Sequence, residues 1–247
     1  MGRKRTISNR TEGGRNSYTK EREMKMQSFS ERVNIKGRSL WSRNALRGVS
    51  LRGERLKREG RKEWRQWSPR TSKIAAGLLK SLQPGILPPI GSICLYLGAG
   101  HGTTISHLHD HVCGAKNQSN GTIVAVDLSP RCIRDLIRLA KSRPGIIPVF
   151  ADCRDFASIS PYLSGQVPWV FQDVSQSGQV DIFIEACEQY LATGGTGILS
   201  LKSESERDAA SAFAYAEDTL VKAGFTLVQC IDLAGWEDKH MLFHVVK

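Results

Sequence analysis

The chain has no run of about 18 or more apolar residues, so the sequence predicts no membrane-spanning helix. Its arginine-rich start lacks the apolar stretch of a secretory signal, although a basic leader poor in acids is compatible with a transit peptide. Six cysteines are present, and none forms a Cys-x-x-Cys pair. A zinc knuckle or a disulfide framework is therefore not predicted, and inert thiols in a reducing compartment fit better.

Acidic residues are scarce near the N-terminus. Residues 1–72 hold 21 Lys and Arg against 7 Asp and Glu, whereas residues 73–247 hold 14 against 17. The net charge of +11 therefore originates in residues 1–72. A basic extension attracts phosphate backbones, so we expect it to contact nucleic acid. A solvated tail is the alternative.

The chain divides into three segments. Residues 1–37 contain few apolar side chains, so we expect a basic, disordered leader. Residues 38–66 are predicted to form a short β-rich segment, and residues 67–247 to form an α/β domain. Within the β-rich segment, short strands are suggested at Leu40-Trp41, Val49–Leu51 and Leu56.

Strands and helices alternate in the α/β domain, and two strands follow each other at its end. This order predicts a mainly parallel sheet with helices on both faces and a terminal antiparallel hairpin. The expected helices span 73–82, 103–112, 130–141, 179–191 and 209–223, and the expected strands span 92–97, 122–126, 146–150, 169–172, 197–201, 226–233 and 241–246. Ligands bind outside the carboxyl ends of such strands. We therefore expect one cleft where polar residues follow strand ends, namely Asp127, Asp152, Asp173 and Lys202.

A glycine-rich turn, Tyr96–Thr104, follows the first strand of this domain. Its glycines allow a tight turn and a close approach to a ligand, and Thr103 and Thr104 open a helix whose free N–H groups attract negative charge. Asp127, after the next strand, could accept hydrogen bonds from both hydroxyls of a ribose. The turn predicts a nucleoside cofactor, with an NAD site or a purely structural turn as alternatives. Asp127 alone could instead cap the helix that starts at Pro130.

The other polar residues each have two interpretations. Asp152 could accept a bond from an adenine amino group or pair with the arginine two positions later. Asp173 and Lys202 end consecutive strands and should be neighbours, although Lys202 could also be solvated. Lys73 opposes the dipole of its own helix, which favours a functional role over a surface position. His240 alone would be an ordinary edge histidine.

Histidines cluster around the helix 103–112, but we do not expect them to bind a metal. His107, His109 and His111 are spaced by two residues and so do not share a helix face. No acid or cysteine completes a ligand set with them or with His101. The sequence therefore predicts no metal site.

Four stretches of the chain resemble fibrillarin, the 2′-O-methyltransferase family of box C/D ribonucleoproteins. They are Trp67–Ala76, Tyr96–His107, Asp173–Gln176 and Asp238–His240, and the resemblance covers roughly residues 50–247. It implies the α/β fold of class I S-adenosylmethionine-dependent methyltransferases, behind a basic, partly disordered N-terminal extension. Asp127 departs from the family, which usually has Glu at this position.

The resemblance also implies S-adenosyl-L-methionine as cofactor and a catalytic set of Lys73, Asp173, Lys202 and His240. Lys202, tuned by Asp173, would orient or deprotonate a ribose 2′-hydroxyl, while Lys73 and His240 would position the sugar. Which residue takes the proton stays open. The implied cofactor-binding residues are Gly98, Ala99, Thr103, Thr104, Asp127, Leu128, Asp152, Cys153, Asp173, Val174, Ser175 and Gln176.

As a member of this family, the chain would methylate rRNA, and also tRNA, under the direction of a box C/D guide RNA. Its partners would be a Nop-domain scaffold protein and a kink-turn-binding protein. It would not associate with a membrane. Its location would be cytoplasmic in an archaeon and nucleolar in a eukaryote. Two alternatives are a stand-alone RNA methyltransferase that uses its basic leader and a non-catalytic assembly protein. The four intact polar residues argue against the latter.

Overall fold

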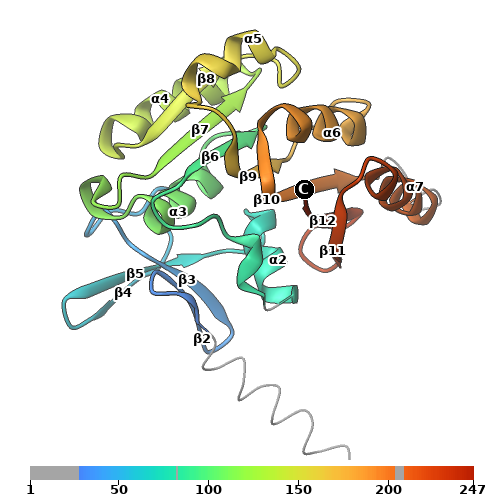
Figure 1. Cartoon of the computed structure of the whole chain (residues 1–247). Helices are drawn as coiled ribbons and strands as arrows, with labels where there is room; N and C mark the ends of the chain where they lie inside the picture. The colour runs from blue at the N-terminus through green and yellow to red at the C-terminus, as the bar shows by residue number, and fades with distance from the viewer. Residues whose placement is uncertain (1–27, 82, 204–208) are drawn as a thin grey trace, which may run out of the picture.

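Two sheets build the molecule, and Figure 1 shows the smaller one below the larger one. The computed structural model describes residues 28–81, 83–203 and 209–247. The leader residues 1–27, for which the sequence predicts disorder, lie outside the described residues. The smaller sheet belongs to the N-terminal region and the larger one to the α/β domain.

The N-terminal sheet is antiparallel, with the strand order β1-β2-β3-β5-β4. Its strands are β1 (Ser28–Ser30), β2 (Val33–Lys36), β3 (Ser39–Arg43), β4 (Leu56–Glu59) and β5 (Lys62–Trp67). Successive side chains of a strand point to opposite faces of the sheet, and the apolar ones here share one face. Phe29, Val33 and Ile35 are buried on that face and join the core under this sheet.

Three predictions for this region are wrong. Disorder does not reach residue 37, because the buried side chains of β1 and β2 give residues 28–36 a place in the sheet. Val49–Leu51 forms no strand, and Val49 is 47% exposed. Trp67 ends β5 instead of opening the α/β domain, so the β-rich segment spans residues 28–67.

The seven-stranded sheet has the order β11-β12-β10-β9-β6-β7-β8. The five strands from β10 to β8 are parallel, while β12 runs antiparallel to both β10 and β11. The predicted mainly parallel sheet with a terminal antiparallel hairpin is confirmed. The strands are β6 (Ile93–Leu97), β7 (Thr122–Asp127), β8 (Ile146–Phe150), β9 (Val167–Gln172), β10 (Leu191–Lys202), β11 (Thr226–Asp232) and β12 (His240–Val246).

Helices cover both faces of this sheet (Figure 1). Residues of α2, α3 and α4 contribute to one apolar core, and residues of α6 and α7 to the other. No helix among the described residues is long and apolar enough to cross a membrane. The helices are α2 (Lys73–Ser81), α3 (Thr103–Val112), α4 (Pro130–Ser142), α5 (Phe156–Ile159), α6 (Gln179–Tyr190) and α7 (Ala209–Lys222), with 3₁₀ turns η1 (Pro84–Ile86), η2 (Ala115–Asn117) and η3 (Ser160–Tyr162).

Helix α3 joins the two sheets and is buried from Thr104 to Val112. Its Asp110 carboxylate accepts from Arg65 of β5 at 2.8 Å and from Arg143, after α4, at 2.5 Å. The two guanidinium charges outweigh the effect of burial and hold the pKa of Asp110 well below its usual range. The N-terminal sheet is thus attached through a buried charge network as well as through apolar packing.

Two histidines of α3, His107 and His111, also contact the N-terminal sheet, whereas His109 contacts the α/β domain. His107 stacks on Trp67 with 5.0 Å between ring centroids, and its Nδ1 lies 2.8 Å from the Ser42 hydroxyl. His109 and His111 reach the backbone carbonyls of Pro144 and Pro88 through Nε2, at 3.0 and 2.8 Å. Among the described residues, no three His, Cys, Asp or Glu side chains converge as a metal site would require.

Candidate active site

The glycine turn between β6 and α3 lies against the end of β9. Gly98, Gly100 and Gly102 all have positive φ, at 78°, 57° and 85°. A Cβ on Gly98 would lie 2.2 Å from the carbonyl oxygen of Asp173. Only glycine therefore allows the two segments to approach this closely. The predicted glycine turn is present and borders the strand end that carries Asp173.

A cleft of about 620 Å³, here called the main cleft, lies beside this turn. It occupies the carboxyl ends of β6 to β9, where open α/β sheets bind their ligands. Its volume is in the range of small-molecule sites. The lining residues are Lys73, Gly98, Gly100, Val126, Asp127, Leu128, Ser129, Ala151, Cys153, Asp173, Val174, Ser175 and Gln176.

Asp127 ends β7 at the wall of the main cleft. Its Oδ2 accepts the N–H of Gly100 at 2.8 Å, and its Oδ1 accepts the N–H of Ser129 at 2.8 Å. Ser129 in turn caps α4, as its hydroxyl accepts from the N–H of Cys132. Asp127 therefore holds the glycine turn and the start of α4 in place. A carboxylate has about four lone-pair sites, so two stay available to a ligand.

Lys73 and Asp173, which lie 100 positions apart, form an ion pair in the main cleft. The Nζ of Lys73 donates to Oδ2 of Asp173 at 2.8 Å. Their side chains are 19% and 23% exposed, so the pair is accessible from the cleft but largely shielded. Asp173 offsets the unfavourable position of a cation at the start of α2.

His240 lies near this pair, at the start of β12. Burial is the largest cause and lowers the pKa of His240, and the charge of Lys73 lowers it further. The bond to the Asp238 carbonyl and the charge of Asp173 raise this pKa, but the net effect is a lowering. The Nδ1 of His240 lies 3.0 Å from that carbonyl, which can only accept a hydrogen bond. In the neutral imidazole the proton is therefore on Nδ1, and Nε2 is free to act as an acceptor. This histidine is nearly buried and is not on an edge strand, because β12 lies between β10 and β11.

Lys202 ends β10 and is the register partner of His240 across the β10–β12 ladder. The structure therefore brings all four predicted catalytic residues to one end of the sheet. Lys202 does not line the main cleft: it lines an adjacent hollow of about 650 Å³, and Ser175 and Gln176 line both. The predicted tuning of Lys202 by Asp173 stays a prediction.

Asp152 adopts the alternative arrangement that the sequence left open. Its Oδ2 forms an ion pair with Arg154 at 2.8 Å, and the bonds from Arg154 lower its pKa. Gln176 also donates to it, at 3.4 Å. Beside it, burial raises the pKa of Cys153 to about 11, so this thiol is neutral and adds a weakly polar surface to the cleft.

The other predicted cofactor residues divide into two groups. Gly98, Asp127, Leu128, Cys153 and Asp173–Gln176 line the main cleft, whereas Ala99, Thr103, Thr104 and Asp152 do not. Thr104 is buried and donates to the Ser72 hydroxyl at 3.0 Å, so it connects α3 to the start of α2.

Four lining residues were not among the predicted catalytic or cofactor-binding ones: Gly100, Val126, Ser129 and Ala151. Each lies within two positions of a predicted residue. Gly100 carries a local signal because it belongs to the glycine turn, and Ser129 carries one because a serine before Pro130 is typical of a helix cap.

Comparisons with known proteins agree with this geometry. The fibrillarin family model matches residues 20–247. A fibrillarin-like rRNA/tRNA 2′-O-methyltransferase from Thermococcus onnurineus is 33% identical over 83% of this chain and 89% of its own length. The corresponding protein of Methanocaldococcus jannaschii is 30% identical, over 82% and 86%.

Solved structures of fibrillarins are similar as well. Aeropyrum pernix fibrillarin in complex with natively bound S-adenosyl-L-methionine has a TM-score of 0.74 and 28% identity, and the match covers 84% of this chain and 89% of that one. A fibrillarin/Nop5p complex has a TM-score of 0.72 and 26% identity, with coverages of 87% and 97%. The family model, the identities and the shared fold together show that this chain belongs to the fibrillarin family.

Proposed function

We propose that this chain is an S-adenosylmethionine-dependent RNA ribose 2′-O-methyltransferase that acts on rRNA and tRNA. The observation that carries the proposal is the Lys73–Asp173 ion pair in the main cleft, with His240 and Lys202 at the same end of the sheet. The names of the curated relatives supply the reaction and the substrates. An assembly protein would have no need for this partly shielded polar group beside a cleft.

The residues of the main cleft fit S-adenosyl-L-methionine. Asp127 has lone pairs available for ribose hydroxyls. Leu128, which is 51% exposed, and the neutral thiol of Cys153 offer weakly polar surfaces for a purine ring. The carboxylate of Asp173 suits a positively charged sulfonium. When bound, this cofactor supplies an electrophilic methyl group on a good leaving group.

The chain's own residues would hold and activate the ribose 2′-hydroxyl. Lys73 is fixed by Asp173, and Lys202 approaches from the adjacent hollow, so both ammonium groups can orient the hydroxyl and steady its developing negative charge. His240 has a lowered pKa and an acceptor at Nε2, which makes it suitable to take the proton at neutral pH. Most of the acceleration would come from positioning.

A Nop-domain protein is the proposed scaffold partner, because a structurally similar fibrillarin was solved in complex with Nop5p. A box C/D guide RNA and a kink-turn-binding protein are proposed as further partners. The basic N-terminal region supports contact with RNA in this assembly. The stand-alone enzyme stays as the second candidate, supported by the same basic region.

The test is transfer of a radioactive methyl group to an rRNA fragment, with and without a matching guide RNA and a purified Nop scaffold with its kink-turn-binding protein. We expect transfer only when all components are present, at one ribose whose 3′ linkage then resists alkali. Transfer to RNA without guide and scaffold would favour the stand-alone enzyme. Cofactor binding without transfer in any mixture would contradict the proposed activity.

A further inference from the structure

A small hollow lies where the N-terminal sheet meets the loop after α3, and we call it the basic hollow. Its volume is about 180 Å³. Arg43 and Arg47 contribute from the end of β3 and the loop that follows it, and Arg61 and Lys62 from the hairpin between β4 and β5. The loop after α3 forms the opposite wall with Gly114 and Ala115. These four cationic side chains surround one concave site together with Arg32, which forms an ion pair with Glu31 at 3.2 Å.

These four cations form no ion pair with any residue in the described parts of the chain. Two carboxylates also line the hollow, Glu63 and Asp110. Glu63 accepts from the Asn44 amide at 2.8 Å and from the Gly48 N–H at 2.7 Å, and it forms an ion pair with Arg58 at 3.7 Å. Asp110 is held in its buried network with two other arginines. The hollow therefore has a positive charge that the described residues do not neutralise.

The loop that forms the opposite wall is held in a costly conformation. Lys116 and Asn117 both have φ of 53°, in the left-handed region that side-chain residues disfavour. The Asn117 amide fixes the loop by bonds of 2.9 and 3.0 Å with the N–H and carbonyl of Gly121. Arg32 adds a bond to the Ser119 hydroxyl at 2.8 Å. These contacts hold in one conformation the loop whose Gly114, Ala115 and Gln118 line the hollow.

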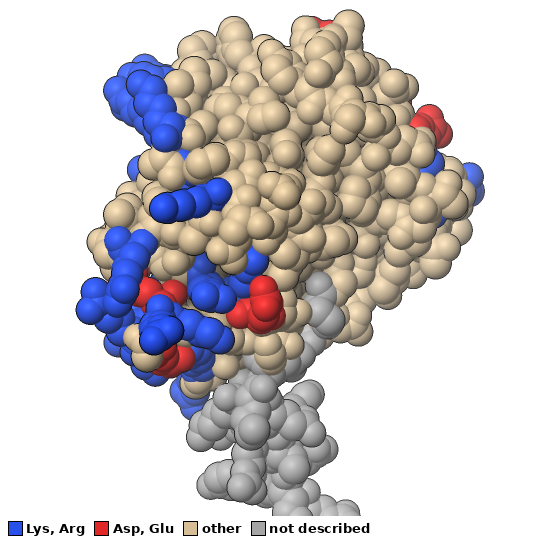
Figure 2. Space-filling view, turned by 60° about the vertical axis from the view of Figure 1, so that its left-hand side comes forward, with Lys and Arg blue, Asp and Glu red and all other residues tan. Residues whose placement is uncertain are grey.

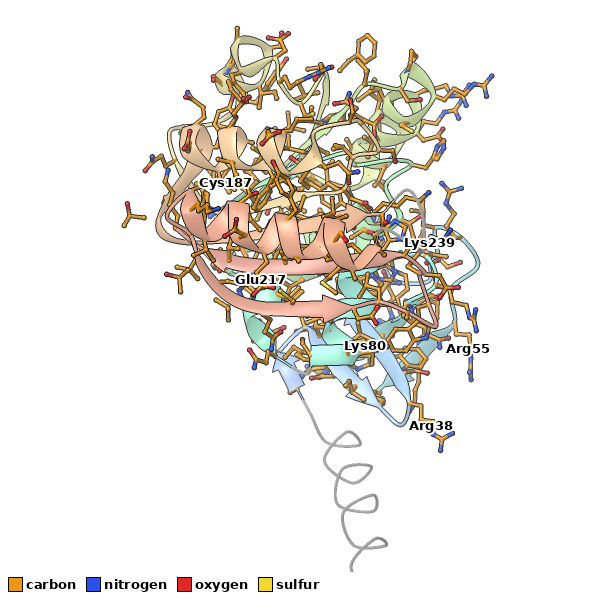
Figure 3. All side chains as sticks on the ribbon, turned by 90° about the vertical axis from the view of Figure 1, so that its right-hand side faces the viewer. Arg38, Arg55, Lys80, Cys187, Glu217 and Lys239 are labelled. Carbon is orange, nitrogen blue, oxygen red and sulfur yellow. The ribbon has the colours of Figure 1, made fainter. Side chains whose placement is uncertain are left out.

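The basic hollow lies at the end of α3 opposite the glycine turn. Since α3 spans Thr103–Val112, the rise of an α-helix places the two sites about 15 Å apart along the helix. Figure 2 shows Lys and Arg side chains gathered on the lower left of one face of the molecule, beside the N-terminal sheet. Figure 3 shows Arg38 and Arg55 pointing outward from the same region. The hollow is thus a concave site within a wider basic surface.

We propose that the basic hollow binds a phosphate of the RNA backbone and anchors the RNA several nucleotides away from the methylated ribose. This inference rests on the proposed function, because it assumes an RNA substrate or guide. Arginine forks match the oxygens of a phosphate, and backbone contacts set the register of a protein on nucleic acid. At about 180 Å³ the hollow is smaller than a typical small-molecule site, which suits a phosphate better than a nucleoside.

Two double variants on the same hairpin provide the test. Arg61→Gln with Lys62→Gln removes two charges from the hollow, and Arg55→Gln with Lys57→Gln removes two charges at the start of the hairpin, outside the lining of the hollow. All four side chains are exposed, so both variants should fold and bind S-adenosyl-L-methionine as the wild type does. Fluorescence anisotropy with a short labelled RNA duplex measures affinity across a salt series.

We expect the Arg61/Lys62 variant to raise the Kd for RNA at low salt at least about fivefold and to reduce the salt slope by about 1 to 2. The Arg55/Lys57 control should change Kd less than about twofold. Equal losses in both variants, or no loss in either, would overturn the proposal. A labelled polyglutamate peptide provides a second comparison. If the Arg61/Lys62 variant binds this peptide more weakly than the wild type but binds RNA equally well, the phosphate proposal is overturned in favour of an acidic protein partner.

Failure of the proposed function would give a different result from failure of the phosphate site. The wild-type protein would bind S-adenosyl-L-methionine and RNA but would transfer no methyl group in the guided assay. In that case a selective loss of RNA affinity in the Arg61/Lys62 variant would still support the phosphate site.

Discussion

Gly98 determines how closely the turn after β6 approaches the end of β9. The Asp173 carbonyl would lie 2.2 Å from an added Cβ, a distance that real structures avoid. The position of Asp173, and through it that of Lys73, therefore depends on a residue without a side chain. Asp127 supports the same turn from the other side through its bond to Gly100.

Gly98→Ala should weaken cofactor binding by moving Asp173 away from the turn. Gly194→Ala is the matched control, because Gly194 has nearly the same φ, 76° against 78°, but open space around an added Cβ. We expect Gly98→Ala to lower the free energy of unfolding by about 1–3 kcal/mol more than the control does. Urea denaturation and calorimetric titration with S-adenosyl-L-methionine measure both effects, and equal behaviour of the two variants would contradict this role of Gly98.

Asp127→Ala should raise the Kd for S-adenosyl-L-methionine about 10- to 100-fold, since a hydrogen bond to a charged group contributes about 1.5–3 kcal/mol. The substitution also leaves the N–H groups of Gly100 and Ser129 without their acceptor. Asp127→Glu retains the carboxylate and should recover most of the affinity. Isothermal titration measures all three proteins, and wild-type affinity in the alanine variant would exclude the ribose contact.

Lys202→Ala should abolish methyl transfer while the cofactor affinity stays within about twofold, because Lys202 lines the adjacent hollow and not the main cleft. Lys222→Ala is a control, since Lys222 is exposed on α7 and forms its ion pair with Asp218 of the same helix. Single-turnover transfer and calorimetric titration separate the two effects. Turnover retained in Lys202→Ala would remove this lysine from the mechanism.

At the scale of elements, α3 is polar in sequence but almost completely buried. It packs on the large sheet and under the N-terminal sheet at the same time, so its histidines and Asp110 find partners on both sides. Buried polar groups need such partners, because an unpaired one costs free energy. His107, His111 and Asp110 therefore serve as contacts between the N-terminal sheet and the α/β domain.

This arrangement predicts that stability falls in mild acid. Burial lowers the pKa values of His109 and His111 from 6.5 to about 4. Between these values the unfolded chain binds protons that the folded chain does not, so stability is complete above pH 6.5 and falls as the pH drops toward 4. Each histidine should account for up to about 3 kcal/mol of this loss.

Urea unfolding at several pH values between 7.5 and 4.5 measures this loss. A double variant, His109→Gln with His111→Gln, should be less stable at neutral pH but should depend less on pH. If the wild-type stability is constant from pH 7 to pH 5, the assigned burial of these two side chains is wrong.

At the scale of the whole molecule, the two sheets form one folding unit. Asp110 connects Arg65 of the N-terminal sheet with Arg143 of the α/β domain, and both arginines are almost completely buried. Loss of either sheet would leave a buried charge without a partner, which costs about 3–5 kcal/mol. The small sheet also shares an apolar core with α3.

The described residues should therefore unfold in one transition. Three of the five tryptophans, Trp41, Trp64 and Trp67, lie in the N-terminal sheet, so fluorescence reports mainly on this sheet once Trp169 and Trp236 are replaced by Phe. Far-UV circular dichroism reports mainly on the helices of the α/β domain. We expect both signals to change at the same urea concentration. Two separate midpoints would show that the sheets are independent.

The sequence by itself determined the order of strands and helices, the glycine turn and the end of the sheet at which polar residues gather. These features depend on local periodicity and on the rule that parallel strands present their carboxyl ends together, so they can be predicted from neighbouring residues. Most predicted element boundaries agree with the structure within one or two residues, as for 103–112 and 146–150.

Only the tertiary structure decided which of those residues line the main cleft and whether β1 and β2 are buried in the N-terminal sheet. Thr104 and Asp152 have the expected positions in the chain, but Ser72 and Arg154 engage their side chains instead. β1 and β2 are short and lie in charged sequence, so their burial depends on contacts with α3 about 80 positions away, such as Ser30 with His111. Long-range pairing of this kind has no local signature, because its free energy comes from groups that meet only in the folded chain.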